Sequence, residues 1–127
     1  CFITKKTLVS AAILKFEGQI STWNSKNNAN PCYRCLFPIQ PASSSIPSCS
    51  QAGVLGTLAG TVGSIQATEA IKEILNIGTS LTGTLLILDL LNNNFRKIKV
   101  NKDPECILCG PSPQILNLNN ASFYERA

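Results

Sequence analysis

Two amino acids, histidine and methionine, are absent from this 127-residue sequence. Because there is no histidine, no cysteine of the chain can form a Cys–His catalytic pair within it. Because there is no methionine and the first residue is Cys1, we expect a fragment of a longer protein rather than a complete translation product. A secretory signal peptide removed before Cys1 would explain the same start.

Aromatic and charged residues are scarce, at 6% and 14% of the chain. The formal net charge is +4, but the cations are dispersed and no run of Lys or Arg occurs. A nucleic-acid-binding surface combines clustered cations with exposed aromatic faces, so this composition argues against a nucleic-acid partner.

Long hydrophobic runs are also missing. The segment between Cys35 and Thr68 contains no charged residue, but its apolar part, residues 52–67, includes four glycines and Gln66. A membrane-spanning helix needs about 20 predominantly apolar residues. We therefore expect no membrane span.

Four of the six cysteines form two Cys-x-x-Cys pairs, Cys32 with Cys35 and Cys106 with Cys109. Each pair places two thiols on one tight turn, and together the pairs match a tetrahedral four-cysteine zinc site. They are much further apart than in a compact zinc ribbon, so the metal would clasp two distant loops. The alternatives are two disulfides, which would close very small loops and cross-link little, or buried thiols without a metal.

Reduced, metal-binding thiols are typical of a cytosol-like compartment. We therefore expect the protein in the cytoplasm or in the stroma of an organelle, which favours the fragment hypothesis over a secreted protein.

Hydrophobic runs and turn residues predict an α/β organisation. Polar and proline-rich segments between these runs are expected to be loops, and the one rich in serine and proline should be a mobile connection. Strands are predicted at 7–14, 18–23, 84–89 and 95–100, turns at 17–18 and 92–94, and loops at 25–31 and 38–48.

One long glycine-rich helix is predicted from about Ser50 to Asn76. Its small residues recur at steps of three and four, which lines them along one helical face. Such a face allows another backbone to approach closely, and the approaching partner could be the sheet, a neighbouring helix or another subunit. The small residues are Gly53, Gly56, Gly60, Gly63, Ala67 and Ala70.

Three blocks of the sequence resemble a known family. They read PCYRCLFP, then PSCSQAGVLGTLAGTVGSIQATEAIKEIL, then DPECILCGPSP. In this order they resemble the C-terminal half of the MoeB/ThiF/HesA adenylyltransferases, which are relatives of the ubiquitin-activating enzymes. The similarity runs from about Leu8 to the end, and the first block is most similar to the molybdopterin-synthase branch.

This resemblance implies a fold and a site. The fold would be the C-terminal part of a Rossmann-like ThiF-type domain with a mixed sheet, one long glycine-rich helix and a zinc clasp held by Cys32, Cys35, Cys106 and Cys109. Residues 1–127 would be one portion of a single domain, and the intact parent would be a homodimer.

The resemblance also implies an activity. These enzymes use ATP and Mg²⁺ to adenylate the C-terminal glycine of a ubiquitin-like sulfur-carrier protein. The loop at 38–48 corresponds to the family's crossing loop, under which the carrier tail is expected to pass. Cys49 corresponds to a cysteine that in some members links covalently to the carrier; a cysteine at a helix start also has a lowered thiol pKa. The alternative is that Cys49 only caps or packs beneath the loop.

The family's residues that hold ATP and Mg²⁺ would lie before Cys1. No phosphate-binding motif replaces them, because the glycines of the helix have neither the G-x-G-x-x-G spacing at a strand end nor a P-loop lysine. We therefore expect no adenylation by these residues alone. The alternative function is a non-catalytic zinc module that binds protein partners.

Overall fold

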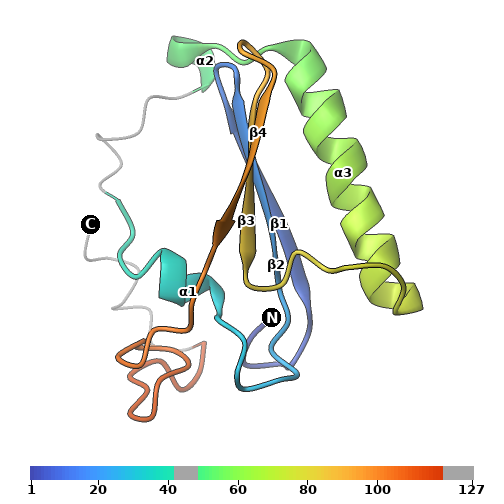
Figure 1. Ribbon diagram of the computed structural model, residues 1–127. Coiled ribbons are helices and arrows are strands. Elements are labelled where there is room, and N and C mark those ends of the chain that lie inside the picture. Colours follow the sequence, from blue (N-terminus) through green and yellow to red (C-terminus); the bar gives the residue numbers. More distant parts are fainter. Residues whose placement is uncertain (42–48, 119–127) are drawn as a thin grey trace.

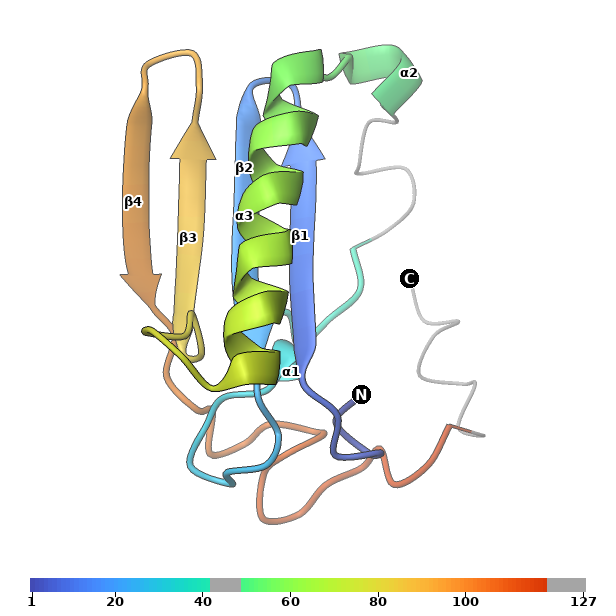
Figure 2. The ribbon, with the colours of Figure 1, turned by 90° about the vertical axis from the view of Figure 1, so that its right-hand side faces the viewer.

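The computed structural model describes residues 1–41 and 49–118. They form a four-stranded sheet with one long helix along one face, and extended loops gather at one end of the sheet (Figures 1 and 2). The strands are β1 (Leu8–Leu14), β2 (Glu17–Trp23), β3 (Thr84–Asp89) and β4 (Asn94–Lys99); the helices are α1 (Tyr33–Leu36), α2 (Cys49–Ala52) and α3 (Gly56–Leu75).

The sheet has the strand order β1-β2-β3-β4 and is antiparallel at every strand pairing. The prediction of a mixed sheet is therefore wrong for the described residues. Short connections explain two of the three pairings, because two residues between β1 and β2 and four between β3 and β4 suffice only for hairpins. The antiparallel pairing of β2 with β3 follows a long connection that contains all three helices. The first turn lies at Lys15 and Phe16 rather than at Glu17 and Gly18, and Lys15 adopts a left-handed backbone conformation there (φ 52°).

The predicted long helix is present but interrupted. α2 ends at Ala52 and α3 starts at Gly56, because Gly53 adopts a left-handed conformation (φ 72°) and Val54 bridges to Lys15 instead. α3 ends where Asn76 adopts the same conformation (φ 52°), as predicted from its position. None of the helices in the described ranges is long and apolar enough to span a membrane.

The main core lies between α3 and the sheet. Ile20 of β2, Leu88 of β3 and Leu58 and Val62 of α3 are almost completely buried together. Gly18 makes this contact possible, because a Cβ atom there would lie 2.5 Å from Cγ2 of Val62. Real Cβ contacts are never so short, so the helix packs directly onto a gap in the side chains of β2.

A buried carboxylate fixes the other end of α3. Glu69 is 4% exposed, and its Oε2 accepts hydrogen bonds from Oγ1 of Thr22 (3.3 Å) and the backbone N–H of Leu81 (3.0 Å). Lys72 forms an ion pair with the second carboxylate oxygen. A buried charge is tolerated only when it is paired and hydrogen-bonded, so Glu69 links α3 to β2 and to the segment that leads into β3.

The glycine face of α3 does not contact the sheet. Gly56, Gly60 and Gly63 are exposed, and a Cβ atom added to any of them would have no neighbour within 4 Å. The prediction that these glycines pack against the sheet or against another helix is thus wrong for these three residues within the described chain. The approach of another subunit remains a prediction.

The contrast between Gly18 and Gly60 predicts opposite effects for one substitution. Gly18→Ala should lower the free energy of unfolding by about 1–3 kcal/mol, because Val62 and α3 must move. Gly60→Ala should raise it by about 0.5–1 kcal/mol, because alanine favours the helix and meets open space. Urea denaturation of both variants measures the two changes, and equal signs would contradict the observed packing.

Candidate metal centre

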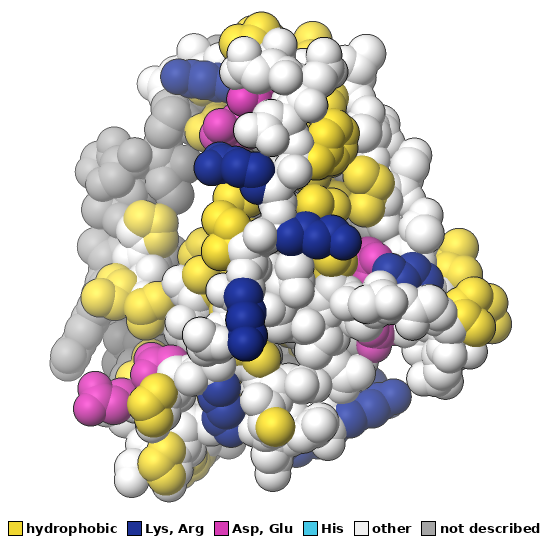
Figure 3. Space-filling model, in the orientation of Figure 1, with side chains coloured by type: hydrophobic (Ala, Val, Ile, Leu, Met, Phe, Trp, Pro, Cys, Tyr) yellow, Lys and Arg dark blue, Asp and Glu magenta, His cyan; other side chains and the backbone are white. Residues whose placement is uncertain are grey.

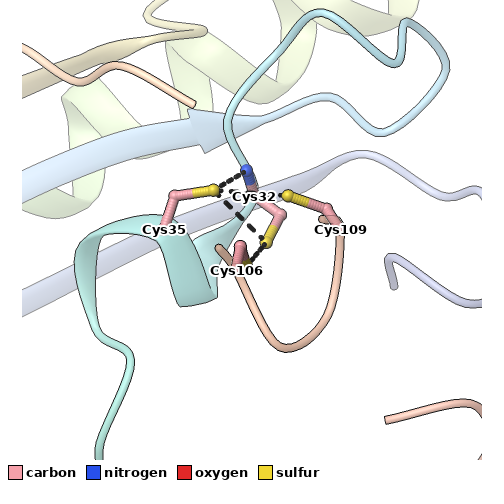
Figure 4. Close-up of side chains that lie close together, drawn as sticks. All are labelled: Cys32, Cys35, Cys106 and Cys109. Carbon is pink, nitrogen blue, oxygen red and sulfur yellow. Dashed lines mark hydrogen bonds between the residues drawn. The ribbon is translucent and has the colours of Figure 1, made fainter. Parts of the chain in front are cut away.

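The four paired cysteines meet at one end of the sheet (Figure 4). Cys32 immediately precedes α1 and Cys35 lies within it, while Cys106 and Cys109 belong to a loop that follows β4. Their four Sγ atoms all lie within 4.8 Å of one another. The structure thus brings together residues that are 74 positions apart, as the sequence predicted.

The sulfur separations suit a tetrahedral metal ion. Sγ of Cys32 lies 3.6 Å from that of Cys106 and 3.8 Å from that of Cys35, and the Cys35 and Cys109 sulfurs are 3.3 Å apart. Four sulfurs at about 2.3 Å from a central ion would be about 3.8 Å apart. Disulfide sulfurs are about 2.05 Å apart, and all four cysteines are free thiols. The disulfide alternative is therefore excluded for this structure.

Local backbone turns position each pair. In the first, the N–H of Cys35 donates to the carbonyl of Cys32 (3.0 Å), and the N–H of Cys32 donates to Sγ of Cys35 (3.4 Å). In the second, the N–H of Gly110 donates to the carbonyl of Cys106 (2.9 Å). A Cβ atom at Gly110 would lie 2.6 Å from that carbonyl oxygen, so the tight turn requires glycine. The sequence signal for this glycine is its place directly after the second pair and before Pro111.

Without a metal, burial favours the protonated thiols of Cys32 and Cys109 by raising the pKa of each. Burial, followed by hydrogen bonding to Cys109 and Cys106, raises the pKa of Cys32 far above the usual thiol range. Burial and the hydrogen bond with Cys35 raise the pKa of Cys109 to about 11. Burial also acts to raise the pKa of Cys106, but N–H groups of Cys109 and Leu108 outweigh it, and the net shift is downward. Cys106 is therefore the thiol that this backbone best prepares as a thiolate.

Aromatic packing supports the first pair from the sheet side. Tyr33, between the two cysteines, meets Trp23 edge to face at 5.6 Å and Phe37 at 4.9 Å between ring centroids. Trp23 belongs to a second core with Leu85 and Val100, on the face of the sheet opposite α3. The position of the cysteines is thus coupled to this core.

Cys49 lies away from the cluster. It is the first residue of the four-residue helix α2, which sits at the end of the sheet opposite α1 (Figure 1). Its side chain is outside the described part of the structure, as are residues 42–48 of the predicted crossing loop. The predictions for this cysteine and this loop therefore stay predictions.

Known proteins are similar to this chain in both sequence and fold. The ThiF family matches residues 1–108. A sulfur carrier protein adenylyltransferase from Thermus thermophilus is 45% identical over 111 residues, which cover 85% of this chain and 41% of that protein. An adenylyltransferase and sulfurtransferase MOCS3 from Mus musculus is 36% identical over 125 residues, or 98% of this chain and 27% of that protein.

A crystal structure of E. coli MccB has a similar fold. Its TM-score is 0.71 at 12% identity, and the match covers 88% of this chain and 34% of that one. This chain thus spans well under half the length of the relatives it matches. On the sequence match over residues 1–108, the chain belongs to the ThiF family.

Proposed function

We propose that this chain is part of an ATP-dependent adenylyltransferase that activates the C-terminal glycine of a ubiquitin-like sulfur-carrier protein. The observation that carries the proposal is the 45% identity to a sulfur carrier protein adenylyltransferase across 85% of the chain. The activity would belong to the intact parent, because these residues contain no phosphate-binding motif.

The four cysteines would hold a structural zinc ion. Four thiolates at tetrahedral spacing are a donor set that suits zinc, and such a site leaves no coordination position for substrate. When bound, zinc supplies folding energy and no reaction chemistry. Cys32 and Cys35 would thereby fix the segment that leads into residues 38–48, the proposed crossing loop for the carrier tail. A reducing compartment, the cytoplasm or an organelle stroma, would keep the thiols available.

The resemblance to the family suggests two further roles, one for Cys49 and one for the outward face of α3, and both belong to this proposal. Cys49, at the start of α2, could form a covalent link with the carrier. The outward face of α3, with Gly60 and Gly63 and the exposed Ile71 and Ile74, would suit contact with a second copy in the intact homodimer.

Zinc content is the first prediction from this proposal. Chain purified under reducing conditions should contain about one zinc ion, and Cys109→Ser should lose it. Removing zinc that is present at about a thousand times its dissociation constant should lower the free energy of unfolding by about 4 kcal/mol. Metal analysis and urea denaturation with and without a chelator test both points.

Cys1→Ser is the matched control, because Cys1 is exposed and outside the cluster. It should retain the zinc. Equal zinc content in the Cys109 and Cys1 variants would contradict the assignment of the ligands.

Zinc affinity should depend on pH. Because the metal-free thiol of Cys109 has a pKa of about 11 and that of Cys32 is also raised, zinc must displace their protons at neutral pH. The apparent affinity should therefore rise steadily between about pH 6 and pH 8, by well over tenfold. Competition with a chromophoric chelator of known pH dependence measures this change. A pH-independent affinity would contradict the protonated state of the metal-free cluster.

A chimera tests the enzymatic proposal. Residues 1–127 would replace the matching part of the Thermus thermophilus relative, and carrier-dependent exchange between ATP and pyrophosphate would be measured. We expect exchange by the chimera and none by this chain alone. Exchange by the isolated chain would contradict the proposed division of roles. A folded, zinc-loaded chimera without exchange would instead favour the alternative of a non-catalytic zinc module.

A further inference from the structure

Strand β4 forms an uncovered edge of the sheet, and it is basic. All six of its residues are exposed, and within the described chain β4 pairs only with β3. α3 covers β1 and β2 but leaves this side of the sheet open (Figure 2). In Figure 3, Lys and Arg side chains follow one another down the middle of the face over β4. We call Lys97, Lys99 and Lys102 the basic edge.

The register shows which backbone groups of β4 are free for pairing. The N–H of Val100 donates to the carbonyl of Gly83 (2.8 Å), so these two residues form a hydrogen-bonded pair. Such pairs alternate along an antiparallel ladder, which makes Ile98 and Arg96 the next residues bonded to β3. The N–H and C=O groups of Phe95, Lys97 and Lys99 therefore point outward from the sheet.

The same three residues share a face. Phe95 and Lys97 stand opposite Leu88 and Leu86, both of which pack in the core under α3. Side chains two residues apart on one strand are about 7 Å from each other. The open edge thus offers backbone pairing groups at three alternate residues, two of which, Lys97 and Lys99, are lysines.

A shallow depression of about 550 Å³ adjoins this edge. All three lysines of the basic edge line it, together with the hydroxyl-bearing Thr82 and Thr84, and no carboxylate does. In the part of the chain described, the only salt bridge joins Lys72 to Glu69, on α3. No acidic side chain among residues 1–41 and 49–118 therefore neutralises the basic edge by a salt bridge.

We propose that the basic edge is a docking site for an extended acidic segment of a partner protein, which adds to the sheet as a strand beside β4. Strand addition would satisfy the outward backbone groups, and carboxylates at alternate positions of the segment would stand beside Lys97 and Lys99. None of the four clustered cysteines lines this depression, and the inference does not rest on the proposed enzymatic activity.

Two other interpretations fit the edge less well. A nucleic acid could use the positive charge but could not pair with a strand edge, and Phe95 is the only aromatic residue on β4. Lysines also protect edge strands against aggregation. That role does not extend to Lys102, which lies beyond the strand, donates a hydrogen bond from its ammonium to the carbonyl of Asn28 and lines the acid-free depression.

Binding of a synthetic peptide tests the proposal. The probe is an acetylated, amidated peptide of about eight residues that alternates Glu with Val, and its control carries Gln in place of Glu. We expect the Glu peptide to bind more tightly than the Gln peptide, and its affinity to fall between about 0.01 M and 0.15 M salt as the Debye length shortens from about 30 Å to about 8 Å. Fluorescence anisotropy of the labelled peptides measures both effects.

Two double variants locate the site. Lys97→Glu with Lys99→Glu should weaken binding of the Glu peptide by about tenfold or more, because attraction becomes repulsion. Lys5→Glu with Lys6→Glu makes the same change in net charge at exposed positions before β1, the opposite edge strand, and should leave binding within about twofold of the parent chain. Equal losses in the two variants would reduce the effect to net charge and overturn the proposal.

Amide hydrogen exchange distinguishes strand addition from loose electrostatic contact. Bound peptide should slow exchange at Phe95, Lys97 and Lys99, whereas Arg96 and Ile98 are already protected by β3. Unchanged exchange at the three outward amides would overturn the proposal, as would absence of binding at about 1 mM peptide. Tighter binding of a single-stranded oligonucleotide of equal charge would overturn it in favour of a nucleic-acid surface.

Discussion

The four-sulfur cluster is the constraint on which the ordered end of this molecule depends. Residues 101–118 contain turns but no helix or strand, and turns alone stabilise a loop only weakly. The cluster joins this loop to α1, whose Tyr33 packs on Trp23 of the sheet. Loop, helix and second core are thus coupled through four side chains.

The opposite face of the sheet is organised by apolar packing. Gly18 lets Val62 of α3 approach β2, and Glu69 fixes the far end of the same helix through Thr22 and Leu81. These contacts use only one side of α3. Its other side, rich in glycine, stays exposed, and interior glycines are costly in a helix that has no contact to gain from them. This asymmetry supports the proposal that a second copy of the chain contacts that side in the intact homodimer.

Different parts of the chain are suited to different work. The cluster has the donor set of a closed structural site, and in the proposed function it would hold loops in place. Cys49 begins α2 at the other end of the sheet, next to the residues proposed to admit the carrier tail. The basic edge lies along a third side, where backbone groups and lysines face outward together. Support, reaction and recognition would thus be separated in space.

The sequence alone predicted most of the elements and the four cysteines that the structure brings together. The strand and helix patterns held because alternation, β-branched residues and an Asn cap are local signals, and Cys-x-x-Cys is a local motif whose chemistry requires a second pair nearby. The errors arose from contacts between distant segments: the break at Gly53 accompanies a bridge between Val54 and Lys15, and the antiparallel pairing of β2 with β3 joins strands separated by all three helices.

Only the tertiary structure decided which surfaces are covered. The small-residue pattern of α3 is the same whichever side faces the sheet, and it was the fit of Val62 against Gly18 that turned Gly56, Gly60 and Gly63 outward. Likewise, Lys97, Lys99 and Lys102 are neighbours in the sequence, but they form an exposed basic edge only because β4 ends the sheet. A motif such as Cys-x-x-Cys can be read from the sequence because its residues are close together along the chain. Whether a side chain is exposed depends instead on which distant segments pack against it.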